Sequence, residues 1–238
     1  MKRLKLLQFF KSNIFTTRIV EKKQVAEGTS EISLRRPRGF EFKAGQYIQV
    51  SVKKILHPDP KGSSRVFSIA SSPNNKKLIS ITFRDSSSGF KQTLKDLPIG
   101  SEVLIEGPHG YFTLPKKVSE PIVFVAGGIG ITPYLSMTRF AIEKKMRFSM
   151  ILIYTNKNKK SSAYLDELKK LADKNTNFTL KTKFSRATKD FIEENVKNPH
   201  SCVWHIAGPP GMVDSARNML FLMGVDDKKI CFEEFVGY

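Results

Sequence analysis

The stretch that most constrains the fold is residues 121–133, PIVFVAGGIGITP, because a short apolar run passes directly into a glycine turn. The run at 122–126 is unbroken and rich in β-branched residues, which is typical of a strand covered on both faces in a parallel sheet. Glycines follow at once, where a side chain would block a close backbone approach and where a positive φ is expected. They are Gly127, Gly128 and Gly130. The stretch therefore predicts a buried strand, a tight turn and a helix.

We expect this helix to begin at Thr132 and Pro133, because threonine caps helix N-termini and proline suits the first turn. Free backbone N–H groups would then lie at the positive end of the helix dipole, where an anion such as a pyrophosphate is favoured. A tight strand-to-helix turn without a ligand has the same pattern. The glycine spacing is not G-x-G-x-x-G, so it does not indicate that dinucleotide fingerprint.

The pattern of elements changes near residues 116–120 and divides the chain in two. Before it, alternating or β-branched segments are separated by glycine, proline and asparagine, which predicts a small antiparallel barrel. Its expected strands are 17–26, 30–36, 46–52, 65–70, 78–84 and 102–106, with a helix over 90–97. Beyond it, strands at 122–126, 148–154, 178–184, 203–207 and 229–232 alternate with helices near 133–145, 162–174, 188–197 and 210–223. This alternation predicts a parallel sheet with ligands at the carboxyl ends of its strands.

The formal net charge of +18 on 238 residues favours an anionic partner, although a lysine-rich solvated surface gives the same charge. The basic residues lack the regular aromatic interleaving of a single-strand binding surface, so we expect no nucleic acid as partner. No apolar run approaches the roughly 20 residues that span a membrane, and no segment resembles a cleavable signal. We therefore expect a cytoplasmic protein without a transmembrane segment.

Residues 1–14 form a basic arm in which lysine and arginine are mixed with leucine and phenylalanine. Two interpretations are open. The arm packs on its own domain, or it makes a peripheral membrane contact as a short basic amphipathic helix.

The cysteines Cys202 and Cys231 are too few for a four-thiolate iron–sulfur cluster or a zinc finger. Both lie in apolar, strand-like segments, so we expect buried and inert thiols. Trp204, between apolar neighbours, is expected in the core. The histidines show no metal-ligand spacing, so we expect no metal site. Any redox chemistry must then come from an organic cofactor.

The first half of the chain carries one segment with the side chains that a flavin needs, RVFS at 65–68. An arginine can bind phosphate, a flat ring can stack, and a hydroxyl can bond near the redox nitrogen. Alternation places Arg65 and Phe67 on one face of the strand and Ser68 on the other. The strand therefore has to end or twist at such a site.

RVFS resembles the R-x-Y-S flavin motif of the ferredoxin-NADP reductase superfamily, with phenylalanine in place of the usual tyrosine. Further segments resemble that family's motifs in the same order: SGFKQTL at 88–94, GPHGYFTLP at 107–115, GGIGITP at 127–133, AGPPGM at 207–212 and the terminal EEFVGY. The resemblance extends from about residue 15 to the C-terminus. It implies a six-stranded antiparallel FAD-binding barrel over 15–118 and a parallel-sheet NAD(P)-binding α/β domain over 119–238.

The resemblance also implies roles around the flavin. Arg65 pairs with a flavin phosphate, Phe67 packs on the isoalloxazine ring, and Ser68 forms a hydrogen bond near N5. Main-chain amides at a helix start bind the pyrophosphate, which agrees with the dipole argument. The flavin-binding positions implied are Arg65, Val66, Phe67, Ser68, Phe90 and Lys91. Because Phe67 has no hydroxyl, a hydrogen bond from this position to the cofactor's sugar is not implied.

The nucleotide-binding positions implied are Gly127, Gly128, Gly130, Ile131, Thr132, Pro133, Ser185, Arg186, Gly208, Pro209 and Met212. The last three resemble the family's C-G-P-x-x-M turn beside the nicotinamide, although Ala207 replaces the cysteine. Hydride transfer needs orientation and a dry contact more than it needs a thiol. The pair Ser185 and Arg186 resembles one that relatives use for the 2′-phosphate, so we favour NADPH over NADH as hydride donor.

In the terminal segment, Glu233 and Phe235 resemble the glutamate and the aromatic residue found near the flavin in relatives, and Tyr238 extends the cofactor-binding tail. A carboxylate there can relay a proton, and a ring can shield the flavin. With Ser68, Glu233 and Phe235 are the expected catalytic residues. A C-terminal strand whose aromatic residues only fill the core is the alternative.

The resemblance implies an FAD-dependent NAD(P)H oxidoreductase that moves hydride from NAD(P)H to FAD and passes electrons onward. The basic composition favours an acidic acceptor protein such as ferredoxin or flavodoxin. Two alternatives stay open: a reductase of free flavin, quinone or ferric complexes, and an electron-transfer subunit or module of a larger redox complex. The charge alone would also suit a nonenzymatic nucleic-acid or membrane-surface protein.

Overall fold

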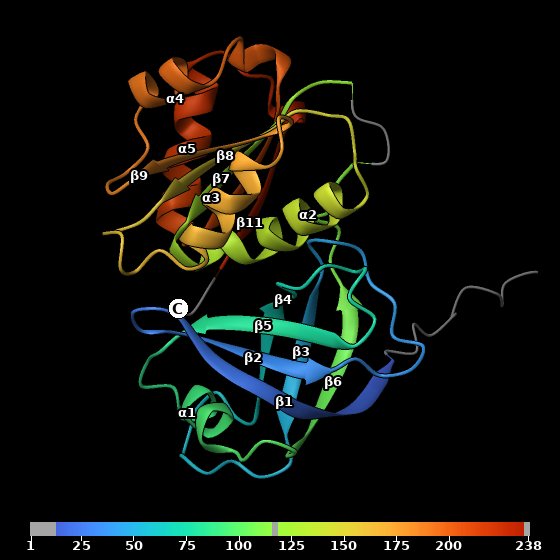
Figure 1. Ribbon diagram of the computed structural model, residues 1–238. Helices are drawn as coiled ribbons and strands as arrows, with labels where there is room; N and C mark the ends of the chain where they lie inside the picture. Colours follow the sequence, from blue (N-terminus) through green and yellow to red (C-terminus); the bar gives the residue numbers. More distant parts are fainter. Residues whose placement is uncertain (1–12, 116–118, 236–238) are drawn as a thin grey trace, which may run out of the picture.

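The computed structural model describes residues 13–115 and 119–235, and within them each half of the chain builds one sheet. Figure 1 shows the first sheet curled into a barrel at the bottom and the second, flanked by helices, at the top. The predicted combination of an antiparallel barrel and a parallel α/β domain is confirmed. The proposed domain limits stay a prediction, because residues 116–118 lie outside the described residues.

The barrel has six antiparallel strands in the order β4-β3-β6-β1-β2-β5. They are β1 (Ile14–Ala26), β2 (Thr29–Arg35), β3 (Tyr47–Val52), β4 (Ser64–Ser68), β5 (Leu78–Arg84) and β6 (Glu102–His109), and helix α1 (Gly89–Asp96) follows β5. Successive side chains of a strand point to opposite faces of the sheet. Accordingly, β3 has buried residues at Ile48, Val50 and Val52, and the residues between them are partly exposed. Most of the predicted basic arm lies outside the described residues. Its last residue, Ile14, already belongs to β1 and pairs with Glu106 of β6.

The second sheet has five parallel strands in the order β11-β10-β7-β8-β9. They are β7 (Ile122–Gly127), β8 (Met150–Thr155), β9 (Phe178–Lys183), β10 (Val203–Gly208) and β11 (Ile230–Glu234). Helices α2 (Ile131–Glu143) and α3 (Leu165–Asp173) pack in the core of one face, and α4 (Lys189–Asn195) and α5 (Pro210–Leu222) in the core of the other. Every residue of β7 is buried, as expected of a central strand. Within the described residues, no helix is long and apolar enough to cross a membrane.

The two domains are joined by a continuous core and by buried polar contacts. Ala44, Ala70 and Phe112 of the first half belong to the same apolar cluster as α2. Arg139 of α2 donates to both carboxylate oxygens of Glu167, at 2.7 Å each, and to the carbonyl oxygen of Ala70 at 2.9 Å. These contacts fix the orientation of the domains, and with it the cleft between them.

Further contacts across the same interface come from Tyr164 and Ser136. The Tyr164 hydroxyl bonds to Glu31 and Thr82 of the barrel, and the Ser136 hydroxyl donates to the carbonyl oxygen of Ser71 at 2.7 Å. Glu31, Thr82 and Ser136 are each no more than 3% exposed. Because buried polar groups are costly when unsatisfied, this network is specific to one domain arrangement.

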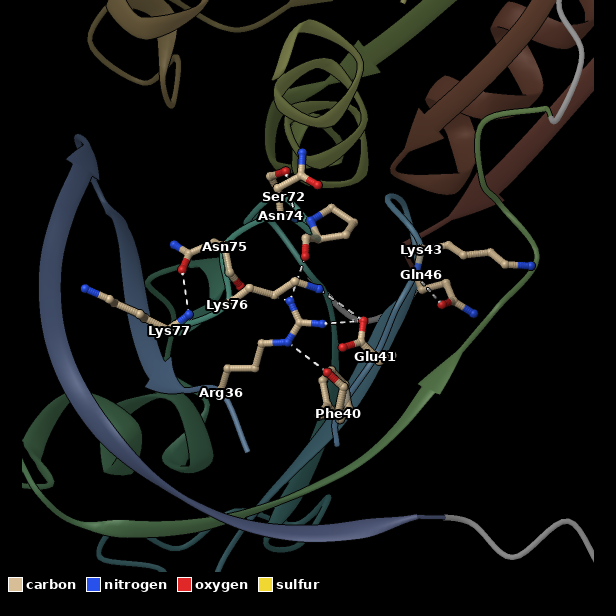
Figure 2. Close-up of polar contacts among 11 residues, drawn as sticks. Arg36, Phe40, Glu41, Lys43, Gln46, Ser72, Asn74, Asn75, Lys76 and Lys77 are labelled. Atoms are coloured by element: carbon tan, nitrogen blue, oxygen red, sulfur yellow. Dashed lines mark hydrogen bonds and ion pairs between the residues drawn. The ribbon is translucent and has the colours of Figure 1, made fainter. Parts of the chain in front are cut away.

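Figure 2 shows Arg36 at the centre of a second group of contacts, between the β2–β3 and β4–β5 loops. Its Nε donates to the carbonyl oxygen of Phe40 at 2.8 Å, and its Nη1 to those of Pro73 and Asn75 at 2.7 and 2.9 Å. The β4–β5 loop that Arg36 holds also contacts α2, because Ser72 donates to Glu143. A buried arginine thus supports the barrel side of the interface.

Candidate functional site: two cavities at the domain interface

A cavity of about 650 Å³ opens between the barrel and the end of β11. The barrel contributes the end of β4, the loop before it and the start of α1, and the α/β domain contributes Glu233, Glu234 and Phe235. The predicted flavin residues Arg65, Val66, Phe67, Ser68 and Lys91 line it. The structure therefore brings together, from both domains, side chains that are far apart in the sequence.

The orientation of Phe67 in β4 bears on its predicted stacking on the flavin ring. Phe67 is 2% exposed and packs inside the barrel, with its ring centroid 5.6 Å from Phe83 and 6.2 Å from Phe90. The register explains this, since Phe67 pairs with Ile48, which faces the barrel core. Val66 is 53% exposed. The role of Phe67 in stacking on the flavin stays a prediction, and most of its ring is already covered by other aromatic rings.

An ion pair lies where the phosphate of a flavin was expected. Arg65 pairs through Nη2 with Asp59, whose other carboxylate oxygen accepts from the backbone N–H of Phe90 at 2.9 Å and from the Ser88 hydroxyl at 2.7 Å. The Phe90 N–H, followed by the Ser88 hydroxyl, holds the pKa of Asp59 well below its usual range. Donors that hold one anion so well also fit a phosphate.

Asp59 was missed in the sequence analysis. It lies in the loop HPDPKG between β3 and β4, and the one signal for it is an acidic residue between two prolines shortly before the arginine of RVFS. The start of α1 has no room for a larger residue, because a Cβ on Gly89 would lie 2.3 Å from the carbonyl oxygens of His57 and Pro58. The loop and the helix start therefore form one unit. Lys91, 5% exposed, adds a buried cation whose pKa is lowered by burial.

The α/β side of this cavity carries an unusual carboxylate. The Oε2 atom of Glu233 is buried and forms no hydrogen bond within the described residues. Burial raises the pKa of Glu233 to about 7. A group with this pKa can take up or release a proton near neutral pH, which fits the predicted proton relay. Phe235 is 8% exposed, and its N–H donates to the carbonyl oxygen of Gly208 at 2.9 Å. Tyr238 lies outside the described residues.

A second cavity, of about 1040 Å³, lies at the carboxyl ends of the parallel strands. Its lining contains many of the predicted nucleotide residues, with Arg84 of the barrel on the opposite side. Those predicted residues are Gly127, Gly128, Ser185, Arg186, Pro209 and Met212. A cavity at this edge of a parallel sheet is the expected ligand position.

The remaining residues of the glycine loop pack rather than line this cavity. Ile131 and Thr132 are no more than 2% exposed, Pro133 is buried, and a Cβ on Gly130 would lie 2.2 Å from the carbonyl oxygen of Ala207. Of the three loop glycines, Gly128 alone has a positive φ, at 56°. Gly130 is thus needed because α2 approaches β10 closely, and the loop can reach a ligand only through its first part.

The start of α2 was predicted to within two residues, but the predicted cap is wrong. Residues Gly128–Gly130 form a 3₁₀ turn, α2 begins at Ile131, and no side chain of the described residues caps it. The hydroxyl of Thr132 donates to the carbonyl oxygen of Ile129 at 3.1 Å, so it acts as a donor inside the turn and not as a cap. The 3₁₀ turn leads directly into the helix, which leaves no extended residue at the position that Thr132 would need for capping.

The cysteine prediction is half right. Cys202 is buried, but Cys231 is exposed. The difference follows from topology, because β11 is an edge strand of its sheet. Trp204 is fully buried, as predicted, and donates through its ring N–H to the carbonyl oxygen of Pro199 at 3.0 Å.

Comparison with known proteins agrees with this geometry. Residues 16–114 match the family model of the oxidoreductase FAD-binding domain, and residues 124–218 match that of the oxidoreductase NAD-binding domain. The reductase component of propane 2-monooxygenase from Rhodococcus jostii is 27% identical over 227 residues, which cover 87% of this chain and 60% of that protein. The reductase subunit of glycine betaine monooxygenase from Pseudomonas aeruginosa is 31% identical over 147 residues, which cover 61% of this chain and 39% of that protein.

The ferredoxin-NADP⁺ reductase of Plasmodium falciparum has the same fold, with a TM-score of 0.76 at 21% identity, covering 94% of this chain and 97% of that one. The chain spans less than two thirds of the length of the first curated relatives that it matches. The two matched domains nevertheless occupy most of the chain. The chain therefore belongs to the ferredoxin-NADP reductase superfamily of FAD- and NAD(P)H-dependent oxidoreductases.

Proposed function

We propose that this protein moves hydride from NAD(P)H to FAD between its two cavities and passes the electrons to a protein acceptor. The observation that carries the proposal is the position of Phe235. This residue lines the barrel cavity, and its N–H bonds to Gly208, the residue directly before Pro209 of the second cavity. A ligand in one cavity and a ligand in the other would therefore approach each other at the end of β11.

Each cavity offers groups suited to one cofactor. Arg65 and the N–H groups at the start of α1 would hold a phosphate of FAD, and Ser68, a residue that is 8% exposed, would bond to its ring through the hydroxyl. The cofactors, when bound, supply the hydride chemistry itself. The protein's part is to orient the two rings, to exclude water with Phe235, and to hold a proton on Glu233 near neutral pH.

For the nucleotide we propose NADPH. Ser185 and Arg186 line the second cavity together with Lys157, so a 2′-phosphate would meet a hydroxyl and two cations. Replacing Arg186 with alanine should raise the KM for NADPH much more than the KM for NADH, because NADH has no 2′-phosphate. Equal effects on both nucleotides would refute the assignment.

For the acceptor we propose an acidic electron-transfer protein such as ferredoxin or flavodoxin, since the formal net charge is +18. A second candidate has support from the relatives, whose names describe reductase components of monooxygenases. In that case the chain is an electron-transfer module of a larger redox complex. Copurification from its source would favour the module, and a steep fall of the reduction rate of a free acidic acceptor with salt would favour the first candidate. The cytoplasmic location expected from the sequence stays a prediction.

The experiment that tests the function is an anaerobic absorbance titration of the purified protein, reconstituted with FAD, first with NADPH and then with NADH. We expect a flavin spectrum that is bleached by close to one equivalent of NADPH and by a larger excess of NADH. A protein that binds no FAD, or whose flavin neither nucleotide bleaches, would refute the proposed reaction.

A further inference from the structure

The loop between β3 and β4, residues 53–63, lies against the start of α1 and along its length. The backbone N–H groups of Leu56 and His57 donate to the Thr93 hydroxyl at 3.0 and 3.2 Å, and the His57 ring bonds to Asp96 at 2.6 Å. Most of the loop is nevertheless exposed, and of its side chains only Ile55 packs against the barrel core. The loop is therefore held in place mainly by polar contacts to α1 and Arg65, and little by apolar packing.

At the tip of this loop, the carboxylate of Asp59 binds the hydrogen-bond donors that are proposed to hold FAD. The Asp59 side chain is 3% exposed, and its two oxygens bind the Arg65 guanidinium, the Phe90 N–H and the Ser88 hydroxyl. Arg65 is further held by carbonyl oxygens of the same loop and strand, those of Lys61 at 2.9 Å and Ser64 at 2.6 Å. The Arg65 Nη2 and the Phe90 N–H are thus already engaged by the protein's own anion.

A phosphate cannot use these donors while the carboxylate holds them. The Phe90 N–H and the Arg65 Nη2 each point at an Asp59 oxygen, and a second anion at the same distance would face that carboxylate as a like charge.

We propose that Asp59 is a built-in competitor for the phosphate groups of FAD, so that the β3–β4 loop has to release Arg65 and the start of α1 before the cofactor binds. The proposal rests on the function proposed above, in which these donors hold FAD. Its consequence is an FAD affinity set by the loop, with the cofactor exchanging when the loop opens.

The test compares FAD affinities of the full chain with substitutions at Asp59 and at a matched position. Asp59→Asn removes the charge at nearly the same shape, and Asp59→Ala also removes the hydrogen-bond acceptor. Glu41→Gln is the control, because it removes one negative charge from the β2–β3 loop of the same barrel and leaves the contacts of residues 53–63 intact. Binding is followed by quenching of flavin fluorescence at fixed salt, and thermal unfolding of the FAD-free protein is measured on the same samples.

If Asp59 competes with FAD, its replacement should raise the FAD affinity, and if Asp59 is merely structural, its replacement should leave the affinity unchanged or lower it. We expect both Asp59 variants to bind FAD at least about tenfold more tightly than the wild type, while their FAD-free forms unfold at a lower temperature, because the ion pair is lost. The control should bind FAD within about twofold of the wild type. If the Asp59 variants bind FAD equally or more weakly, the competitor is refuted while the flavin function stands. If the wild type and all variants fail to bind FAD, both proposals fail. The Asn variant keeps the test valid should the Ala variant not fold.

Discussion

Replacing Glu233 with glutamine should make the protein more stable at alkaline pH, and the gain should vanish in acid. The pKa of Glu233 is raised from 4.5 to about 7, because burial disfavours the charged carboxylate. Below pH 4.5 the group is protonated in both the folded and the unfolded chain, so it has no effect on stability. As the pH rises toward 7, the unfolded chain loses this proton first, and the free energy of unfolding falls.

The magnitude follows from the shift. One pKa unit corresponds to about 1.36 kcal/mol, so the full penalty above pH 7 is about 3 kcal/mol. Glutamine stays neutral and escapes the penalty. The difference in unfolding free energy between Glu233→Gln and wild type should therefore grow by about 2–3 kcal/mol from pH 5 to pH 8. Any fixed cost of leaving the buried amide without a partner is the same at both pH values and cancels.

The assay is urea unfolding of the FAD-free protein at pH 5, 6, 7 and 8, followed by circular dichroism. Glu234→Gln is the matched control, since it changes the neighbouring residue, which is exposed. Its difference from wild type should stay within about 0.5 kcal/mol over the same range. A change of less than about 0.5 kcal/mol for Glu233→Gln would mean that the carboxylate is not desolvated, and the reasoning about its proton would fail.

Two further predictions concern packing. Arg139→Met removes the part-buried donor that bridges α3 and the barrel carbonyl of Ala70, so the free energy of unfolding should fall by about 2–4 kcal/mol, read as a drop in Tm. Arg18→Ala breaks an exposed ion pair and should change it by less than about 1 kcal/mol. Similar effects of the two substitutions would contradict the bridging role of Arg139. Gly130→Ala places a Cβ 2.2 Å from the carbonyl oxygen of Ala207, so it should lower Tm. It should also weaken the binding of NADPH, measured by calorimetry. An unchanged Tm would show that α2 can shift away from β10.

Much of the fold can be predicted from the sequence because two periodicities dominate it. The alternation of Ile48, Val50 and Val52 with polar residues fixes the inner face of the barrel, and the continuous apolar run of β7 marks a central parallel strand. The chain positions of the strands follow from turn residues. Which strand neighbours which does not follow, because pairing depends on contacts between distant segments.

The site is predictable as a set of motifs but not as a geometry. Arg65 and Glu233 could be proposed from their resemblance to family motifs, and the structure puts both on one cavity. Phe67 turns into the barrel because of its cross-strand partner, and Asp59 reaches Arg65 because of the path of an irregular loop. Neither follows from the local sequence. Apolar neighbours predict a buried Cys231, but β11 is an edge strand, and Cys231 and Phe232 on its two faces are both exposed.

The shared core between the domains has a consequence for motion. Because Ala44, Ala70 and Phe112 pack in the same cluster as α2, and Arg139 bridges the boundary, separating the domains would expose apolar surface and leave buried donors without acceptors. A hinge between them is therefore a costly mode of opening. The two cavities therefore keep their relative positions when a ligand enters, and the distance between them is a fixed dimension of the scaffold.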